Sequence, residues 1–503
     1  MSNTFDIVVI GGGINGTGTA ADAAGRGLKV LLCEQNDLAS ATSFNSSKLI
    51  HGGLRYLEHY EFRLVKEALA EREVLIKNAP HIIKPLIFRL PHQRHLRPSW
   101  MIRAGLFLYD NLAKRVTLPP SKGIKFLENS ALIPSIKKGF EYSDGWVDDA
   151  RLVVLNALSA KENNAKILTK TKCIKIIRET YFWLVTLKDV FTGEETEVKT
   201  KAIVNASGPW VAKLFNGIIP LKSPQNIRLI KGSHIVVPRI HDEEQAYMLQ
   251  NADERIIFVI PFEEEFSLIG TTDVEHKGDP SDVKISDDEI NYLVNITNQY
   301  FNKIISRKDI ITTYSGVRPL LDDESDSAQA VTRDYTLELS DKNKLTPILS
   351  IFGGKITTYR KLSEAAIDKI AQYFPGIGPS WTKHKALTGG DFDNKVELEN
   401  ALKNKYPLLS HSLIKRFVRS YGSYSDLLLK GKTDIDSLGD FFGSDLYAIE
   451  VDYLIKHEWA LTVEDVIWRR SKRGLYLTPN QVDKLSDYIQ KHPNVIARKT
   501  LNK

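Results

Sequence analysis

Cysteine is almost absent from this chain, with only Cys33 and Cys173 among 503 residues. Two thiols cannot form the disulfide framework of a small secreted domain, and neither stands in a Cys/His cluster with metal-ligand spacing. Cys33 also falls in a predicted buried strand. We therefore expect no disulfide, a reducing compartment and no bound metal.

Long apolar runs are absent as well, since no stretch reaches the roughly 18 residues that a transmembrane helix needs. The first predicted strand begins so close to Met1 that it leaves no room for a signal or transit peptide. Strong charge of one sign is also lacking, because 68 Lys and Arg face 62 Asp and Glu, a net charge of +6. That excess does not by itself indicate nucleic acid, but it suits an anionic substrate or an anionic membrane surface. Any membrane association is expected to be peripheral.

The N-terminal stretch carries the pattern of a dinucleotide site. The apolar strand FDIVVI runs into GGGING, which places Gly11, Gly13 and Gly16 in G-x-G-x-x-G spacing before a predicted helix over 15–26. These glycines allow the tight turn, the approach of a pyrophosphate and close packing of helix on strand. The second strand, LKVLLCE, ends on Glu34, the type of residue that binds a ribose. A lone glycine motif is weak evidence, but strand, helix, strand and acid together predict a dinucleotide cofactor.

The segment after Glu34 cannot be an ordinary helix or strand. It reads NDLASATSFNSSKLIHGGLRY, a run of small and polar residues that ends in a glycine pair and Arg55. Amphipathic helices are then predicted over 61–80 and 97–115, with a strand over 83–91 between them. The second helix either packs normally or lies on anionic lipid, because it carries large apolar residues with Arg103, Lys114 and Arg115 nearby.

A further helix with an acidic start is predicted over 142–165. The stretch 226–273 is rich in strand signals and predicts a mainly antiparallel sheet, followed by a helix that Ser286 caps. After a linker over 375–391, the remaining sequence is mostly helical and highly charged. Its most basic part, WRRSKRGL, is either a solvated face or a contact with a partner subunit or lipid headgroups.

Several cations stand at turns rather than on regular charged faces. Arg55 follows a glycine pair, Arg318 lies in SGVRP, Arg333 lies in VTRDY, and Lys355 follows a glycine pair. An arginine fork suits a phosphate group, although any one of these residues could equally form a surface ion pair. His234, in KGSHIVVP, is either a hydrogen-bonded core residue or an acceptor for a substrate proton.

Three other turns allow two interpretations each. The strand KAIVNASGPW ends at a small-residue turn around Gly208, which either approaches a dinucleotide or simply ends the strand. Thr271, Thr272 and Asp273 either position a ligand or form an Asx-type turn. Gly353 and Gly354 lead into a helix N-terminus that can hold an anion.

Taken together, DIVVIGGGINGTGTAADAAGRG, ATSFNSSKLIHGGLRYLE, NASGPWV, RLIKGSHIVVP, IGTTD, TYSGVRPL and FGGKITTYRKL resemble the aerobic, FAD-dependent glycerol-3-phosphate dehydrogenases. The resemblance extends to HEWALTVEDVIWRRSKRGL near the C-terminus. It implies an α/β fold: a Rossmann-like FAD-binding domain of the D-amino-acid-oxidase type, an antiparallel-sheet substrate domain and a C-terminal helical domain. The expected boundaries are 1–80, 141–212 and 346–388 for the FAD-binding domain, 81–140 and 213–345 for the substrate domain, and 389–503 for the helical domain.

The resemblance also assigns roles to residues of this chain. The cofactor-binding residues would be Gly11, Gly12, Gly13, Ile14, Gly16, Glu34, Thr42, Ser43, Ser46, Ser47, Lys48, Gly208, Gly353, Gly354 and Lys355. The substrate residues would be Arg55, Tyr56, His234, Arg318, Arg333 and Lys355, with His234, Arg318 and Lys355 acting in catalysis. Hydride would pass from C2 of sn-glycerol 3-phosphate to FAD, and the electrons would pass on to ubiquinone. His234 is the expected base, although the cationic pocket could lower the pKa of the alcohol for another acceptor.

The expected partners are sn-glycerol 3-phosphate, a membrane quinone, anionic lipid and a second copy of the chain, but no nucleic acid. The expected location is the cytoplasmic face of a bacterial inner membrane, with peripheral attachment, because the calcium-binding extension and transit peptide of mitochondrial relatives are missing. An oxidase that uses O2 is the alternative, disfavoured because no long inserted segment occurs. An FAD-containing RNA-binding or RNA-modifying protein is less favoured. Phe44 and Asn45 depart from the smaller residues expected at their positions, which could alter packing near the flavin.

Overall fold

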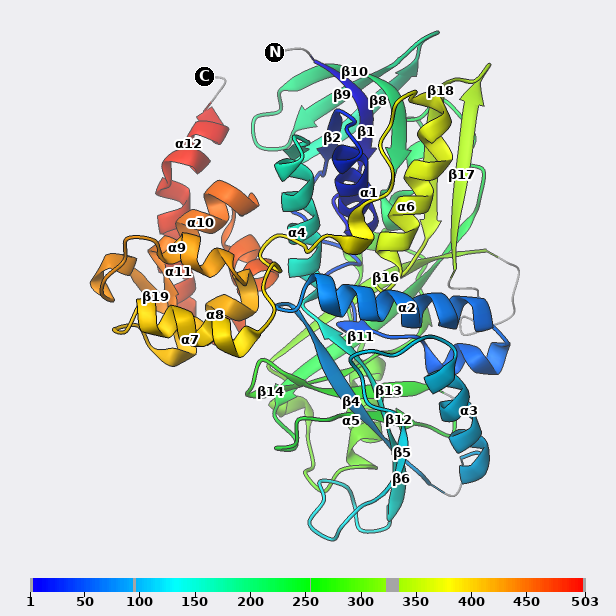
Figure 1. Ribbon diagram of the computed structural model, residues 1–503, viewed down its shortest axis with the longest axis vertical. Helices are drawn as coiled ribbons and strands as arrows, with labels where there is room; N and C mark the ends of the chain where they lie inside the picture. Colours follow the sequence, from blue (N-terminus) through cyan, green and yellow to red (C-terminus); the bar gives the residue numbers. More distant parts are fainter. Residues whose placement is uncertain (1–2, 94–95, 254, 323–333, 501–503) are drawn as a thin grey trace.

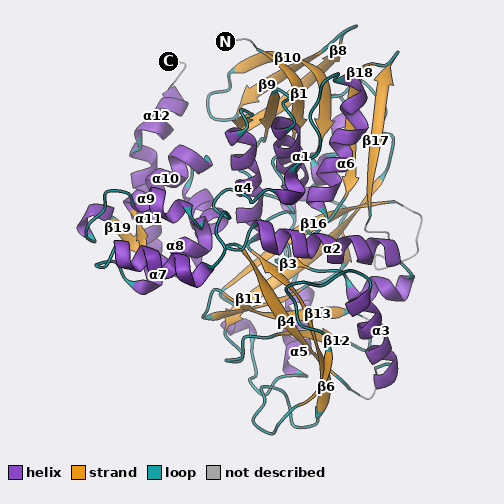
Figure 2. Ribbon diagram, viewed as in Figure 1, coloured by secondary structure: helices purple, strands orange, loops and turns teal. Residues whose placement is uncertain are grey.

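The computed structural model describes residues 3–93, 96–253, 255–322 and 334–500. Two large sheets lie one beyond the other along the long axis of the molecule, and a helical domain packs at the side (Figure 1). The C-terminal helices form their own hydrophobic core, which includes Leu402, Phe417 and Leu454. Figure 2 shows how completely helices dominate this last part of the chain. The predicted fold class is confirmed.

The first sheet has the arrangement expected of a dinucleotide-binding domain. Its central strand β1 (Thr4–Ile10) pairs in parallel with both β2 (Val30–Cys33) and β10 (Glu195–Asn205). The sheet continues from β2 to β7 (Lys166–Leu168) and from β10 to β18 (Leu345–Gly353) and β17 (Tyr335–Lys342). The antiparallel pair β8 (Thr171–Arg178) and β9 (Trp183–Asp189) joins it through the pairing of β9 with β10. One face is covered by α1 (Ile14–Gly25), α4 (Asp149–Glu162) and α6 (Tyr359–Ile370), which contact one another (Figure 1).

The second sheet is antiparallel except where β12 (Ala246–Gln250) pairs in parallel with β4 (Ile83–Pro91). Its longest pairing joins β11 (Ile227–Pro238) to β16 (Thr312–Leu321), which aligns His234 with Tyr314 and Ile230 with Arg318. The other members are β3 (Leu49–Ile50), β5 (Lys122–Lys125), β6 (Lys138–Val147), β13 (Ile256–Phe262), β14 (Phe266–Gly270) and β15 (Val274–Glu275).

Most predicted elements are present with small shifts at their ends. The strand over 83–91 is β4, and the two helices that flank it are α2 (Phe62–Asn78) and α3 (Ser99–Asn111). Ser286 caps α5 (Asp287–Asn298) through a capping box with Glu289, as predicted.

The helix predicted over 142–165 is wrong in its first part. Residues 142–147 belong to β6, which is buried throughout this stretch and pairs with β4 along its whole length. Helix α4 starts only after Asp148, whose side chain accepts a hydrogen bond from the backbone N–H of Arg151. Pairing with a strand distant in sequence therefore overrides the helical pattern of the segment.

The C-terminal domain contains α7 (Lys395–Lys405), α8 (His411–Tyr421), α9 (Tyr424–Leu429), α10 (Ala448–Glu458), α11 (Pro479–Lys491) and α12 (Pro493–Thr500). Both interpretations of its basic stretch WRRSKRGL are wrong. Arg470, Lys472 and Arg473 are buried and form ion pairs with acids of the other two domains. The stretch is an internal domain contact.

The predicted domain ranges remain a prediction. Three strands lie in a different sheet from the one that these ranges imply. β3 and β6 belong to the second sheet although 1–80 and 141–212 were assigned to the cofactor domain, and β17 belongs to the first sheet. Across the described ranges, the model contains no helix long and apolar enough to cross a membrane.

Candidate active site

A cavity of about 660 Å³ lies between the two sheets. The carboxyl ends of β1, β2, β10 and β18 open onto it, and β11 and β16 of the second sheet close it from the other side. The carboxyl edge of a parallel sheet is where α/β proteins bind their ligands.

The glycine motif forms the cradle at the centre of this cavity. Gly11 has a positive φ of 114°, and a Cβ added there would lie 2.4 Å from Ala206 O. A Cβ on Gly16 would lie 1.9 Å from Gly11 O, so only glycine allows the helix to approach the strand this closely. Gly13 lines the cavity at the start of α1, where the described structure shows no side-chain cap. The positive end of α1 therefore faces the cavity, as a pyrophosphate requires.

Glu34 lies at one end of the cavity. Its carboxylate accepts hydrogen bonds from the N–H groups of Gly12 (2.7 Å) and Asn36 (2.8 Å), and burial raises its pKa. These bonds fix the carboxylate at the edge of the cavity, and each oxygen keeps a lone pair for a ribose hydroxyl.

The segment 42–48 lines the middle of the cavity with small hydroxyl side chains. Ser43 Oγ accepts a hydrogen bond from Ile14 N at 3.0 Å, and Thr42 Oγ1 donates one to Val317 O at 2.7 Å, so the segment is bonded to helix α1 and to β16 of the second sheet. The predicted cofactor residues that are described line the cavity, except Gly12, Gly16 and Lys48. The ammonium group of Lys48 instead forms a buried ion pair with Asp149 at 2.8 Å.

The bulky residues Phe44 and Asn45 are accommodated by small and aromatic neighbours. A Cβ on Gly316 would lie 2.7 Å from Asn45 Cβ, so the glycine provides the space that Asn45 occupies. The Phe44 ring lies 6.1 Å from the Tyr314 ring, an ordinary aromatic contact. The departures at these two positions therefore leave the cavity wall intact.

Positive charge gathers at the other end of the cavity. Arg55, Tyr56, Arg318 and Lys355 all line it, and Lys355 Nζ lies 3.7 Å from the centre of the Tyr56 ring. The guanidinium of Arg318 is ion-paired with Asp273, and it also donates to Thr271 Oγ1 at 3.1 Å. Arg333 lies outside the described residues.

His234 lies at the same end, on β11. Its Nε2 is 2.9 Å from Ser47 Oγ, and its ring stacks on Tyr314 at 4.7 Å. Burial, together with the nearby charges of Arg318 and Lys48, holds the pKa of His234 well below its usual value. The imidazole is therefore neutral at pH 7, so one of its ring nitrogens carries a lone pair that can accept a hydrogen bond from a hydroxyl group.

Sequence reasoning missed a second imidazole, His51. It lines the same cavity, and burial lowers its pKa to about 4, with further contributions from Lys355, Arg72 and Arg318. The available signal was its place in SSKLIHGG, between the predicted cofactor residues and Arg55. What the sequence could not show was that Lys355, about 300 residues later, lies close to it.

These features fit FAD. The cavity offers a carboxylate for a ribose, a helix N-terminus for a diphosphate and a wall of small hydroxyl side chains, in that order toward the cationic end. No group of His, Cys, Asp and Glu in the described part of the chain is arranged to hold a metal ion.

Known proteins share both the fold and the sequence. A family model of FAD dependent oxidoreductases matches residues 6–343, and a model of the C-terminal domain of alpha-glycerophosphate oxidase matches residues 380–492. The aerobic glycerol-3-phosphate dehydrogenase of Escherichia coli is 56% identical over 487 residues, which cover 97% of each chain. The D-erythritol 1-phosphate dehydrogenase of Brucella abortus is 46% identical over 480 residues, 94% of this chain and 95% of that protein.

A solved structure agrees with these relatives. The glycerol-3-phosphate dehydrogenase from Bacillus halodurans, complexed with FAD, superimposes with a TM-score of 0.76 at 26% identity. The match covers 99% of this chain and 92% of that one. The resemblance to FAD-dependent glycerol-3-phosphate dehydrogenases is thereby confirmed, and FAD is the cofactor. This chain belongs to the FAD-dependent oxidoreductase family, in the branch that carries the C-terminal domain of alpha-glycerophosphate oxidase.

Proposed function

We propose that this enzyme oxidises sn-glycerol 3-phosphate to dihydroxyacetone phosphate and transfers the electrons to a membrane quinone. The observation that carries the proposal is that one cavity contains both an FAD cradle and a cationic pocket, with two neutral imidazoles near the cations. A phosphate ester of a small alcohol needs this combination of anion binding and proton acceptance.

The cations would divide the work of binding. Arg55, Arg318 and Lys355 would hold the phosphate, and Arg318 is already oriented by its bonds to Asp273 and Thr271. This preorganisation reduces the entropy cost of binding an anion. The binding roles of these residues, and those of Tyr56 and the segment 42–48, are part of the proposal.

His234 would accept the proton of the C2 hydroxyl group. Its Nε2 lies at hydrogen-bond distance from Ser47, which orients the ring, and its low pKa keeps it unprotonated. Bound FAD supplies the acceptor for the hydride that leaves C2. His51 is the second candidate acceptor, because its imidazole lines the same cavity.

Anaerobic reduction of the purified FAD enzyme tests the reaction. Addition of sn-glycerol 3-phosphate should bleach the flavin absorbance near its visible maximum with release of dihydroxyacetone phosphate. D-erythritol 1-phosphate is the informative competitor, since a relative acts on it. Faster bleaching by the four-carbon substrate, or none by glycerol 3-phosphate, would contradict the proposal.

The electron acceptor is tested separately. Under air, turnover should consume ubiquinone and release little hydrogen peroxide. Peroxide in equal amount to product would identify an oxidase instead. A homodimer, also part of the proposal, is checked by the sedimentation coefficient of the detergent-free enzyme.

The surface around α3 supports attachment to a membrane. Trp100, Met101, Phe107 and Leu108 are exposed on this helix, and Tyr60 and Phe62 are exposed directly after the segment 54–59, which contacts it. We call these six residues the α3 surface. Cations flank it at Arg97, Arg103, Lys114 and Arg115. Exposed apolar side chains beside basic residues suit the interface of an anionic bilayer at the cytoplasmic face of the inner membrane.

A further inference from the structure

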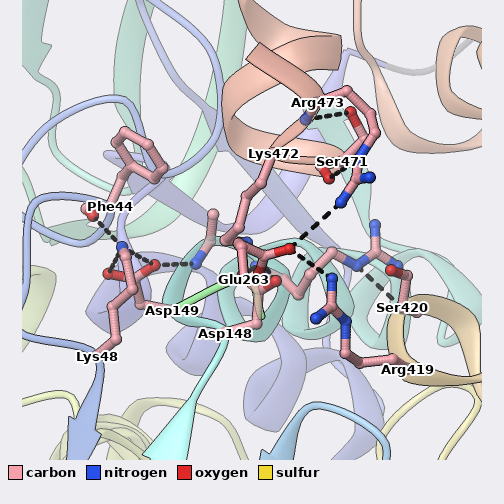
Figure 3. Close-up of polar contacts among 12 residues, drawn as sticks. Phe44, Lys48, Asp148, Asp149, Glu263, Arg419, Ser420, Ser471, Lys472 and Arg473 are labelled. Carbon is pink, nitrogen blue, oxygen red and sulfur yellow. Dashed lines mark hydrogen bonds and ion pairs between the residues drawn. The ribbon is translucent and has the colours of Figure 1, made fainter. Parts of the chain in front are cut away.

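Two buried acids begin helix α4, and each is paired with a lysine from a different part of the chain. Asp149 pairs with Lys48 of the cavity wall, and Asp148 pairs with Lys472 of the C-terminal domain (Figure 3). Lys472 is 3% exposed and Lys48 is 1% exposed. The acids also complement the positive end of the helix. We call these four residues the α4 charge cluster.

The inner half of the cluster holds the wall of the cavity. Asp149 accepts a hydrogen bond from Ser46 Oγ at 2.7 Å as well as the ion pair from Lys48. Lys48 Nζ also donates to Phe44 O at 2.9 Å, so one side chain closes the segment 44–48 into a compact turn. Lys48 itself has a positive φ of 59°. The turn therefore depends on a buried ion pair rather than on regular secondary structure.

Two contacts lead from this turn to His234. Ser47 Oγ lies 2.9 Å from His234 Nε2, and Tyr314, which stacks on the His234 ring, donates from its hydroxyl to Ser46 O at 3.0 Å. The ammonium of Lys48 lies 5.2 Å from the centre of the same Tyr314 ring. A displacement of Lys48 would thus move both groups that orient the imidazole.

The outer half of the cluster connects this turn to the C-terminal domain. Lys472 does not line the cavity, as far as the described residues show, and its ammonium contacts Asp148, the cap of α4. Its neighbour Arg473 also leaves the C-terminal domain but pairs with Glu263, which directly follows β13 of the second sheet. Figure 3 shows the two side chains leaving one loop toward different acids.

We propose that the α4 charge cluster positions the catalytic imidazole from outside the cavity. Lys472 of the C-terminal domain fixes the start of α4, Asp149 fixes the turn 44–48, and this turn fixes His234. Lys48, Asp148, Asp149 and Lys472 are positioning residues in this scheme. The inference rests on the proposed function for the substrate used to measure it and for the role of His234 as the proton acceptor.

The variant Lys472→Met tests the outer half, with Arg473→Met as the matched control from the same loop, since both side chains form ion pairs outside the C-terminal domain. Lys472→Met should keep FAD and leave KM for sn-glycerol 3-phosphate within about threefold, because the phosphate-binding cations are untouched. The rate of anaerobic flavin reduction at saturating substrate should fall about tenfold or more, since small misplacement of a reacting group costs this much. The visible flavin spectrum should shift slightly, and Lys472→Arg should restore the rate.

The control separates positioning from general docking of the domain. Arg473→Met should leave the saturated reduction rate within about twofold, because the Glu263 carboxylate pairs with Arg419 and Arg473 and, among the described residues, forms no hydrogen bond or ion pair with the turn 44–48. Equal losses in Lys472→Met and Arg473→Met, an unchanged rate in Lys472→Met, or a change in KM alone would each overturn the inference. Failure of the wild-type enzyme to be reduced at all would overturn the proposed function instead.

A second variant tests the inference if Lys472→Met does not yield folded, FAD-containing enzyme. Asp148→Asn keeps an oxygen to cap α4 but removes the charge that Lys472 faces. Its saturated reduction rate should fall at least about threefold with KM preserved. An Asp148→Asn enzyme with the wild-type rate would overturn the inference.

Discussion

At the scale of single residues, Arg318 is the clearest anion-binding group. Its guanidinium is held by Asp273 and Thr271 and still lines the cavity. Arg318→Ala should raise KM for sn-glycerol 3-phosphate about 10- to 100-fold, because a charge-assisted hydrogen bond to phosphate is lost. FAD content should not change. Arg307→Ala, which removes an exposed ion pair with Asp287, is the control, and an equal KM in both variants would remove Arg318 from the phosphate site.

The two imidazoles make different predictions. His234→Asn should slow flavin reduction at saturating substrate about 100-fold or more, as loss of a general base does, and His51→Asn should slow it much less. Since burial lowers the pKa of both histidines, the wild-type rate at saturation should show no acid limb near pH 6.5. A stopped-flow pH series between pH 5 and 8 checks this. A larger loss of rate in His51→Asn than in His234→Asn would identify His51 as the base.

The limits of prediction at this scale follow from distance in sequence. Gly11, Gly13 and Glu34 were found because the whole cradle is encoded in about 30 consecutive residues. His51 was missed because only its closeness to Lys355 distinguishes it from any other histidine. The ion pair of Lys48 with Asp149 was missed for the same reason, since about 100 residues separate the partners.

At the scale of elements, helix α3 has an exposed apolar side and a buried side. Trp100 and Phe107 are 70% and 64% exposed, whereas Leu106 and Tyr109 are buried. The double variant Trp100→Ser, Phe107→Ser should weaken binding to phosphatidylglycerol-containing vesicles at least about 100-fold, because each aromatic side chain contributes about 1.5–3 kcal/mol when it is buried. Flotation of the enzyme with vesicles measures this.

The control for this prediction lies far from α3 in the fold. Tyr181→Ser and Val190→Ser change exposed apolar residues near the ends of β9 in the first sheet, and they should leave vesicle binding unchanged. Reduction of the flavin by substrate should be normal in all these variants, while reduction of vesicle-embedded quinone should fall only with the α3 changes. Equal vesicle binding by the α3 variant and the wild type would remove this surface from the membrane contact.

Elements were predicted well where local pattern decides them and poorly where tertiary contacts do. Residues 142–147 read as the start of a helix because acids follow them, but pairing with β4 makes them a strand. The stretch around Arg470 read as a surface because its charges are dense. Its partner Asp37 lies more than 400 residues earlier, so the ion pair has no local sequence signal.

At the scale of the whole molecule, buried ion pairs join the three parts. Arg470 binds Asp37 of the cofactor domain, Glu458 binds Arg151 of α4, and Glu263 of the second sheet receives Arg473. Replacing a buried pair by apolar residues is often neutral, whereas removing one partner is strongly destabilising. Arg470→Met should therefore lower stability by about 3–5 kcal/mol, and Arg470→Met with Asp37→Leu should recover part of that loss. Thermal unfolding of the single and double variants measures the difference, and additive losses would contradict it.

Acid should destabilise the folded enzyme through histidines that lie outside the cavity. Burial lowers the pKa of His81 to about 3 and of His241 to about 4, both below the usual value of 6.5. Between the folded and the unfolded pKa values, these histidines bind protons in the unfolded chain but not in the native state. Their contribution to the free energy of unfolding is therefore fully present above pH 6.5. It is lost as the pH falls from 6.5 toward the folded pKa values.

Asp22 opposes the effect of the two histidines on stability in acid. At pH 5.5 each of the two histidines should lower the free energy of unfolding by about 1.4 kcal/mol. Burial raises the pKa of Asp22 to about 6, so its carboxyl group binds a proton in the native state and should raise the free energy of unfolding by about 1 kcal/mol. The melting temperature should therefore fall between pH 7 and pH 5.5. The double variant His81→Gln, His241→Gln should have a lower melting temperature at pH 7 but a shallower decline in acid. A decline as steep as that of the wild type would show that other groups govern acid unfolding.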